Sequence, residues 1–280
     1  MSISLSPREF AVWQQYIYEI SGIHLDNSKD YLVETRLQGL LKECGATDFS
    51  DFHRKVTSDF SRVLRRRVID AITTNETSFF RDQSPFELLR HKLLPELIDR
   101  RRKNNMVRTT PIRIWSAACS TGQEVYSIAI VIKELLGSMN GFDVRILGTD
   151  ISDHAVAQAS HGYFSNLELG RGIRDDSVRK YFVSEGNQWK ICDEVRAMTS
   201  FRTMNLLEPF TFPVPFDLIF CRNVAIYFNE KDKIKLFRNL GRVLAKDGAL
   251  LIGSTESIAG LCPEYKPQRY HRSVFYQMEP

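Results

Sequence analysis

The sequence predicts an α/β protein, in which a doubly wound parallel β-sheet follows a small all-helical region. From residue 106 onward, short apolar runs of strand character alternate with segments of helical periodicity, as in a sheet that carries helices on both faces. Before about residue 73, apolar residues recur at helical spacing instead. A chain of 280 residues with 43% hydrophobic content can bury the substantial core that such a fold needs.

Two apolar stripes mark the helical region, residues 1–73. One stripe consists of Phe10, Trp13, Tyr16 and Ile17, and the other of Tyr31, Leu32, Leu37, Leu40 and Leu41. Residues 74–105 form a connecting loop and helix, because polar residues and two adjacent phenylalanines interrupt the pattern over 73–82 and helical periodicity resumes over 85–102. We expect this connecting segment to contribute to the functional site.

The sheet region comprises residues 106–280. Strands are expected at 112–116, 144–150, 216–221 and 249–253, and helices after the first strand up to residue 136, from 153 onward, and at 231–243. The alternation over 270–278 predicts an antiparallel strand, so that the sheet ends in a hairpin-like edge. Charged, helix-like residues and two short β-like runs around the turn 184–187 interrupt the rhythm, which predicts an inserted small β-subdomain over about 163–201.

Composition excludes several classes of protein. No apolar run approaches the roughly 20 residues that span a bilayer, and the first ten residues lack a signal-peptide core, so a cytoplasmic protein is expected. The five cysteines form no C-x-x-C pair, and the six histidines show no metal-ligand spacing. We therefore expect reduced thiols and no metal.

The most informative motif is the small-residue turn 117–122, which lies between a predicted strand and a predicted helix. A ligand can approach the backbone there and meet free N–H groups at the helix N-terminus. Gly122 is the single glycine of this turn, which argues against a dinucleotide. Asp150 ends the next strand, where a carboxylate binds ribose hydroxyls in such sheets, and Ser152 and Asp153 supply helix caps that leave it free. Glu124 has two possible roles: it contacts the ligand, or it completes a capping box with Thr121.

Two arginine-rich clusters carry more information than the net charge of +4. Arg100, Arg101, Arg102 and Lys103 end a predicted helix, where cations are favourable. Arg62, Arg65, Arg66 and Arg67 fall in another helix and form either a solvated face or a docking surface for an acidic partner. Aromatic residues do not alternate with this second cluster, which weakens a nucleic-acid reading.

Five blocks of the sequence resemble, in order and spacing, the chemotaxis receptor methyltransferases of the CheR family. The blocks are TTNETSFFRD (73–82), IRIWSAACSTGQEVYSIA (112–129), ILGTDIS (146–152), MNLLEP (204–209) and FDLIFCRNVAIYF (216–228). The resemblance covers nearly the whole chain. It implies a Rossmann-like doubly wound sheet of the S-adenosylmethionine-dependent methyltransferase type, with S-adenosyl-L-methionine as cofactor and S-adenosyl-L-homocysteine as product.

The resemblance also implies roles for individual residues. Asn75, Thr77 and Arg81 would reach over the cofactor, and Glu124 and Asp150 would bind its polar ends, with Asp150 at the ribose. Asn205 and Leu206 would flank the adenine, Arg222 and Asn223 would line the site, and Tyr227 would lie close to the transferred methyl group. Simpler readings are that Asn75 and Thr77 are helix caps and that Tyr227 belongs to the core.

The family transfers methyl groups to receptor glutamates, which are ionised in the cytosol and need no general base. We expect Arg81 to hold the substrate carboxylate and Tyr227 to orient the reacting groups. The arginine cluster at 62–67 would then dock methyl-accepting chemotaxis receptors, without nucleic acid or membrane insertion, and the enzyme would act as a monomer.

The turn 184–187 departs from the family pattern, because it is short and poor in glycine compared with members that bind a tethering peptide at the receptor C-terminus. We therefore expect tether-independent action. Two alternatives remain at this point, namely a nucleic-acid methyltransferase with the same cofactor fold and a signalling adaptor that has lost its chemistry.

Overall fold

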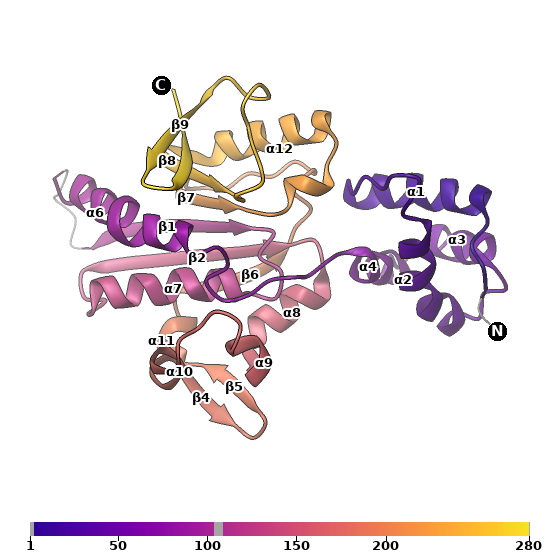
Figure 1. Cartoon of the computed structure of the whole chain (residues 1–280), viewed down its shortest axis with the longest axis horizontal. Coiled ribbons are helices and arrows are strands. Elements are labelled where there is room, and N and C mark those ends of the chain that lie inside the picture. The colour runs from indigo at the N-terminus through magenta and orange to yellow at the C-terminus, as the bar shows by residue number, and fades with distance from the viewer. Residues whose placement is uncertain (1–2, 104–108, 280) are drawn as a thin grey trace.

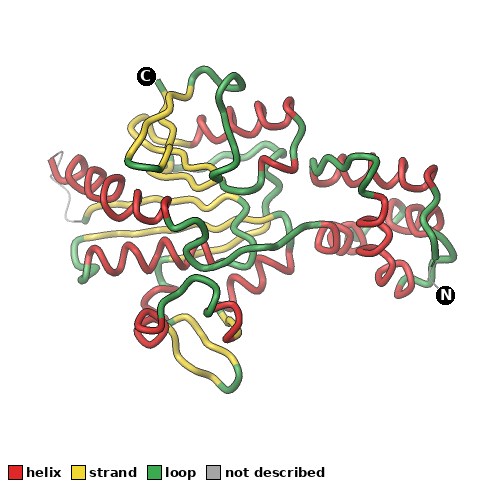
Figure 2. Tube along the Cα trace, viewed as in Figure 1, coloured by secondary structure: helices red, strands yellow, loops and turns green. Residues whose placement is uncertain are grey.

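The computed structural model describes residues 3–103 and 109–279, and the boundary expected between residues 105 and 106 lies outside them. Figures 1 and 2 show a helical domain at one end of the molecule and a twisted sheet with flanking helices at the other. None of the helices in the described ranges has both the length and the hydropathy needed to span a bilayer.

Four helices form the helical domain and enclose a core of their own. They are α1 (Pro7–Ser21), α2 (Asp30–Glu43), α3 (Phe49–Thr57) and α4 (Val63–Ile72). Ser6 and Glu9 form a capping box at the start of α1. Trp13 is fully buried and donates from Nε1 to the carbonyl of Phe49 at 3.0 Å. The predicted stripes are correct except at Tyr31, which is 61% exposed.

The predicted helix over 85–102 is observed as three consecutive segments. These are α5 (Ser84–Leu88), a π-helical turn η1 (Leu89–Leu93) and α6 (Leu94–Lys103). The sequence suggested only that the cations at the end of α6 complement the helix dipole. In the structure they also form ion pairs. Arg101 forms an ion pair with the buried Asp217, and Arg100 lies 3.3 Å from Asp247. These pairs fix α6 against the sheet.

The large sheet has seven strands in the order β6-β2-β1-β7-β8-β10-β9. Its strands are β1 (Thr110–Ala117), β2 (Phe142–Asp150), β6 (Thr199–Thr203), β7 (Phe216–Cys221), β8 (Leu244–Ile252), β9 (Tyr265–Tyr270) and β10 (Ser273–Met278). The first five in spatial order pair in parallel, which confirms the predicted fold class. The antiparallel strand predicted over 270–278 is β10, and it pairs with β9 at the edge of the sheet as a hairpin. The helices that follow strands are α7 (Gln123–Leu136), α8 (Asp153–His161), the 3₁₀ turn η2 (Ala225–Tyr227) and α12 (Glu230–Val243).

Alternate residues of the central strands face opposite layers, as strand geometry requires. Ile112 and Ile114 of β1 pack with α5, α6 and α7, whereas Trp115 and Ala117 pack on the side of α12. Both sets are fully buried. This two-sided burial explains the nearly continuous apolar runs of the parallel strands.

The insertion forms a separate three-stranded antiparallel sheet in the order β3-β5-β4. Its elements are β3 (Tyr163–Ser165), α9 (Asn166–Leu169), α10 (Asp175–Tyr181), β4 (Phe182–Glu185), β5 (Gln188–Ile191) and α11 (Asp193–Arg196). The range expected for it, about 163–201, is too long at its end. Residues 199–201 belong to β6, which pairs with β2 in the large sheet. β6 is short and half-polar, so its periodicity did not reveal it.

The helical domain lies against the carboxyl ends of the parallel strands (Figure 1). On one side, Ser152 Oγ donates to Asp70 Oδ1 at 2.7 Å. On the other side, Tyr18 Oη donates to Asp232 Oδ2 at 2.8 Å, and the amide of His24 donates to the carbonyl of Tyr227 at 2.9 Å. These contacts bracket the cavity described next.

Candidate active site

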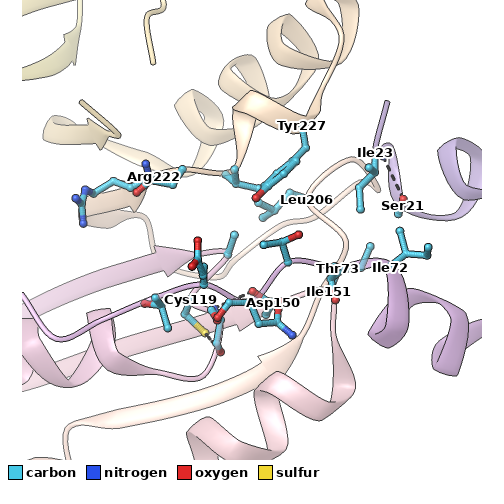
Figure 3. A pocket seen from close by; sticks show the side chains of 18 of the residues that line it. Ser21, Ile23, Ile72, Thr73, Cys119, Asp150, Ile151, Leu206, Arg222 and Tyr227 are labelled. Atoms are coloured by element: carbon cyan, nitrogen blue, oxygen red, sulfur yellow. Dashed lines mark hydrogen bonds between the residues drawn. The ribbon is translucent and has the colours of Figure 1, made fainter. Parts of the chain in front are cut away.

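A cavity lies between the carboxyl ends of β1, β2 and β7, the connecting segment and the helical domain. It encloses about 1110 Å³ of empty space, part of it open to solvent. Figure 3 shows Tyr227 on one side of it, Asp150 on the opposite side, and Ser21 at the end formed by the helical domain. Its lining includes all ten residues that the sequence assigned to the site: Asn75, Thr77, Arg81, Glu124, Asp150, Asn205, Leu206, Arg222, Asn223 and Tyr227. Their individual roles stay predictions.

Asp150 ends β2 and is 7% exposed, and burial raises the pKa of its carboxyl. Oδ2 accepts the amide of Ser120 at 2.8 Å, and Oδ1 accepts the amide of Ser152 at 3.0 Å. The expectation that Asp150 has no structural duty is therefore wrong, because it joins the turn after β1 to the end of β2. Each oxygen accepts one of these amides and keeps a further lone pair for a ligand hydroxyl.

The turn after β1 has an unusual backbone, because Ala118 and Ser120 adopt positive φ angles of 64° and 50°. Gly122, with a φ of 95°, is the N-cap of α7 and has no side-chain cap. A Cβ at Gly122 would lie 2.9 Å from the Cβ of Ala159, so the packing of α7 beside α8 requires glycine here. The turn places only the small residues Ala118, Cys119 and Ser120 at the cavity.

Glu124 does not form the capping box that was its alternative reading. Thr121 Oγ1 donates to Gln123 at 2.8 Å instead of receiving a helix amide. Glu124 Oε1 accepts from Ser116 Oγ at 2.8 Å, and Oε2 lies 2.7 Å from Nη1 of Arg222. The side chain is 12% exposed and borders the cavity.

Arg222 follows β7 and connects two acidic residues from distant parts of the chain. Its side chain is 1% exposed, and its guanidinium pairs with Glu124 and with Asp82, each at 2.7 Å. Nη2 also donates to the carbonyl of Arg81 at 2.9 Å. Within the described residues, Nε of Arg222 is a buried donor with no partner.

The connecting segment crosses the cavity between α4 and α5 without helical structure, and α5 begins only at Ser84. The reading of Asn75 and Thr77 as helix caps is therefore wrong. Ser120 Oγ donates to the carbonyl of Asn75 at 3.0 Å. Arg81 Nη1 donates to the carbonyl of Glu76 at 2.9 Å. These bonds hold the segment over the strand ends.

The remaining assigned residues lie on loops after β6 and β7. Asn205 Oδ1 accepts the amide of Leu207 at 3.0 Å, and its Nδ2 contacts the carbonyl of Ile20 at 3.4 Å. Leu206 is 5% exposed and forms an apolar wall. Tyr227 is half-buried, and its ring both packs on the sheet's core and lines the cavity. The core reading and the site reading of Tyr227 are thus compatible.

Sequence reasoning missed the contribution of the helical domain to the cavity. Ser21, Ile23, Leu25 and Leu32 line it. The available signal was Gly22, which ends α1 with a φ of 76°, followed by the apolar residues Ile23 and Leu25 outside either helical stripe. Cys119 also lines the cavity, but burial raises the pKa of its thiol well above the ordinary value, so it stays protonated.

These features define a class of protein. A doubly wound sheet, a small-residue turn and a carboxylate at the end of the adjacent strand form a nucleoside site. The apolar wall at Leu206 suits a base, and the buried acidic groups suit a ligand with cationic ends rather than phosphates. Over the described residues, no cluster of three or more candidate ligands is arranged to bind a metal. The site therefore fits S-adenosylmethionine, which defines the class as S-adenosylmethionine-dependent methyltransferases.

Comparison with known proteins specifies the family. Residues 8–73 match the family model "CheR methyltransferase, all-alpha domain", and residues 75–272 match "CheR methyltransferase, SAM binding domain". The chemotaxis protein methyltransferase of Vibrio parahaemolyticus is 37% identical over 281 residues, which cover 99% of each chain. Chemotaxis protein methyltransferase 1 of Pseudomonas aeruginosa is 34% identical, over 98% of this chain and 99% of its own. The corresponding protein of Borreliella burgdorferi is 34% identical, over 93% and 92%.

This chain belongs to the CheR family of chemotaxis methyltransferases. The resemblance read from the five sequence blocks is thereby confirmed, as are S-adenosylmethionine as its cofactor and methylation in chemotactic adaptation as its function.

Proposed function

We propose that the enzyme methylates the side-chain carboxylates of specific glutamates on chemotaxis receptors and forms glutamate methyl esters. The observation that carries this proposal is the absence of histidine and lysine among the described residues that line the cavity. Of the three carboxylates in the lining, those of Glu124 and Asp150 already accept protein donors on both oxygens, and that of Glu76 is exposed at the connecting segment. An acceptor that is already ionised at neutral pH fits such a site, and a glutamate is one.

We assign the residues the roles that the family resemblance implies. Asp150 keeps lone pairs for the ribose, Asn205 and Leu206 flank the adenine, and Glu124 faces the cationic end of the cofactor. Asn75 and Thr77 reach over the cofactor from the connecting segment, while Arg222 and Asn223 complete the wall. Arg81 holds the substrate carboxylate, and Tyr227 orients the reacting groups.

S-adenosylmethionine supplies an electrophilic methyl group when it is bound. The chain's own residues then have to exclude water and align the incoming carboxylate with that group, because charge is neutralised as the reaction proceeds. Arg81 suits the contact with the substrate carboxylate because it is partly exposed and, within the described residues, its side chain makes a single hydrogen bond, to the carbonyl of Glu76. A guanidinium binds a carboxylate with matched geometry.

The receptor partner accounts for the arginine cluster at 62–67. Within the described residues, Arg65 lies 4.0 Å from Glu208, Arg66 lies 3.6 Å from Asp153, and Arg67 pairs with Glu43. Arg62 is exposed and has no ion pair in the same set of residues. We assign Arg62 the main share of steering an acidic receptor surface, since the other three side chains also hold the protein together.

We further propose that the enzyme acts as a monomer in the cytoplasm, where the helical signalling region of such receptors lies, and does not need a tethering peptide. The loop between β4 and β5 contains only Gly186 and Asn187, since Glu185 pairs with Gln188. A two-residue loop offers little shaped surface for a peptide strand. Val183 on the outer strand β4 is exposed. The proposal of tether independence rests on the short loop between β4 and β5, not on this strand.

Incubation with tritiated S-adenosylmethionine and receptor-containing membranes tests the chemistry. We expect label in the receptor that mild base releases as volatile methanol, because methyl esters hydrolyse under these conditions. Label that resists base, or that appears in added RNA instead, would contradict glutamate methylation. Receptors in which the acceptor glutamates are replaced by alanine serve as the control.

A further inference from the structure

The loop after β7 carries Asn223 and Tyr227, and its backbone needs support from outside the sheet. Asn223 has a φ of 58°, in the left-handed region that non-glycine residues seldom adopt. The parallel pairing of β7 with β8 ends at Cys221 and Ile252. The amides that follow lie beyond the ladder and must find other acceptors.

Glu256 provides those acceptors from the loop after β8. Its Oε2 accepts the amides of Asn223 at 2.8 Å and of Gly253 at 2.7 Å, and its Oε1 accepts the amide of Val224 at 3.1 Å. Hydrogen bonds to an ionised acceptor are stronger than neutral ones. The amide of Glu256 donates to the carbonyl of Gly253 at 3.0 Å, and Ile258, 1% exposed, anchors the turn in the core.

Gly253 gives independent evidence that the fold requires the Glu256 carboxylate to lie close to the loop after β7. A Cβ at this position would lie 2.6 Å from Oε2 of Glu256, 2.9 Å from Nδ2 of Asn223 and 3.0 Å from its amide nitrogen. Only glycine lets the carboxylate and the loop come this close.

Glu256 itself does not line the cofactor cavity. It borders a second cavity instead, together with Asp82 and Arg272. Any effect of Glu256 on methyl transfer must therefore pass through the residues that it holds.

We propose that Glu256 is a positioning residue for methyl transfer, which fixes the backbone at 223–224 and thereby the orientation of Asn223 and Tyr227 in the active site. The inference rests on the proposed function of these two residues. Displacement of a reacting group by about 1 Å is enough to slow an enzyme about 100-fold. Loss of Glu256 would displace Asn223 and Tyr227 in this way. The other cofactor contacts, on β1, β2 and the connecting segment, would remain.

The test replaces Glu256 by glutamine, which keeps the size but removes one acceptor oxygen. Whichever backbone N–H groups face the NH2 of the glutamine side chain lose their acceptor, because NH2 only donates. We expect kcat for receptor methylation to fall by about 10- to 100-fold, while the Kd for S-adenosylmethionine, measured by calorimetry, changes by less than about threefold. Thr255→Ala, at an exposed position in the same turn, is the matched control and should retain wild-type values.

A receptor-free measurement separates this inference from the proposed function. In spectra of ¹⁵N-asparagine-labelled protein, the amide proton of Asn223 should move upfield in Glu256→Gln, because its charged acceptor is gone. If wild type fails to methylate receptor glutamates, the proposed function is wrong, and the Asn223 shift still decides whether Glu256 holds the loop. An unchanged shift would overturn the inference. Equal losses in kcat, cofactor affinity and unfolding temperature would also overturn it, since they would mark Glu256 as a general stabiliser.

Discussion

The buried ion pair between Glu124 and Arg222 allows a quantitative test in the absence of cofactor. We consider Glu124→Gln, which removes a charge at constant volume beside a guanidinium whose side chain is 1% exposed. Hydrogen bonds to charged groups contribute about 1.5–3 kcal/mol and neutral ones about 0.5–1.5 kcal/mol. Asp82 still neutralises Arg222, so the loss stays below the cost of an unpaired buried charge. We therefore expect a loss of about 1–2 kcal/mol in the free energy of unfolding.

The assay is thermal unfolding of the cofactor-free protein, followed by circular dichroism. For a chain of this size, about 1 kcal/mol corresponds to roughly 2 °C, so the unfolding temperature should fall by about 2–4 °C. Glu43→Gln is the matched control, because Glu43 pairs with Arg67 at the surface, where the two side chains are 60% and 46% exposed. Exposed pairs contribute between about 0 and 1 kcal/mol. Equal unfolding temperatures for Glu124→Gln and wild type, or an equal fall in both variants, would refute the reasoning.

Five further predictions concern function. Asp150→Asn should raise the Kd for S-adenosylmethionine by about 10- to 100-fold in calorimetry, since it weakens a charged hydrogen bond to the ribose. Because burial raises the pKa of Asp150, wild-type affinity should begin to fall at a higher pH than for an ordinary aspartate as the solution is acidified, whereas the asparagine variant should lack this dependence. Arg81→Ala should lower kcat much more than it weakens cofactor binding, and equal losses would count against its role at the substrate. Arg62→Glu should slow receptor methylation at low salt but leave cofactor affinity intact, and an unchanged rate would dismiss the docking role. A peptide matching the receptor C-terminus should show no heat of binding, and micromolar affinity would disprove tether independence.

Strand and helix periodicity predicted the fold class because the parallel strands are buried on both faces and read as apolar runs. β6 escaped this reasoning, since an edge strand such as Thr199–Thr203 has too few buried residues to show a period. Glu124 and Asp150 came from the local strand–turn–helix pattern and the other eight site residues from the family resemblance, and the structure brings all ten to one cavity. Contacts between residues that are distant in the sequence could not be predicted from such motifs. Nothing adjacent in sequence links Arg222 to Asp82, or Glu256 to Asn223.

Residues of the helical domain form part of the cavity wall, so ligand binding affects the stability of both domains. Since Ser21, Ile23 and Leu25 face the same space as Asp150, a ligand there bridges two separately built cores and adds its binding energy to the cohesion of both. Occupancy of the cleft therefore couples the melting of one half to that of the other. Depletion of S-adenosylmethionine in the cell would therefore lower the stability of this enzyme as well as its rate of methylation.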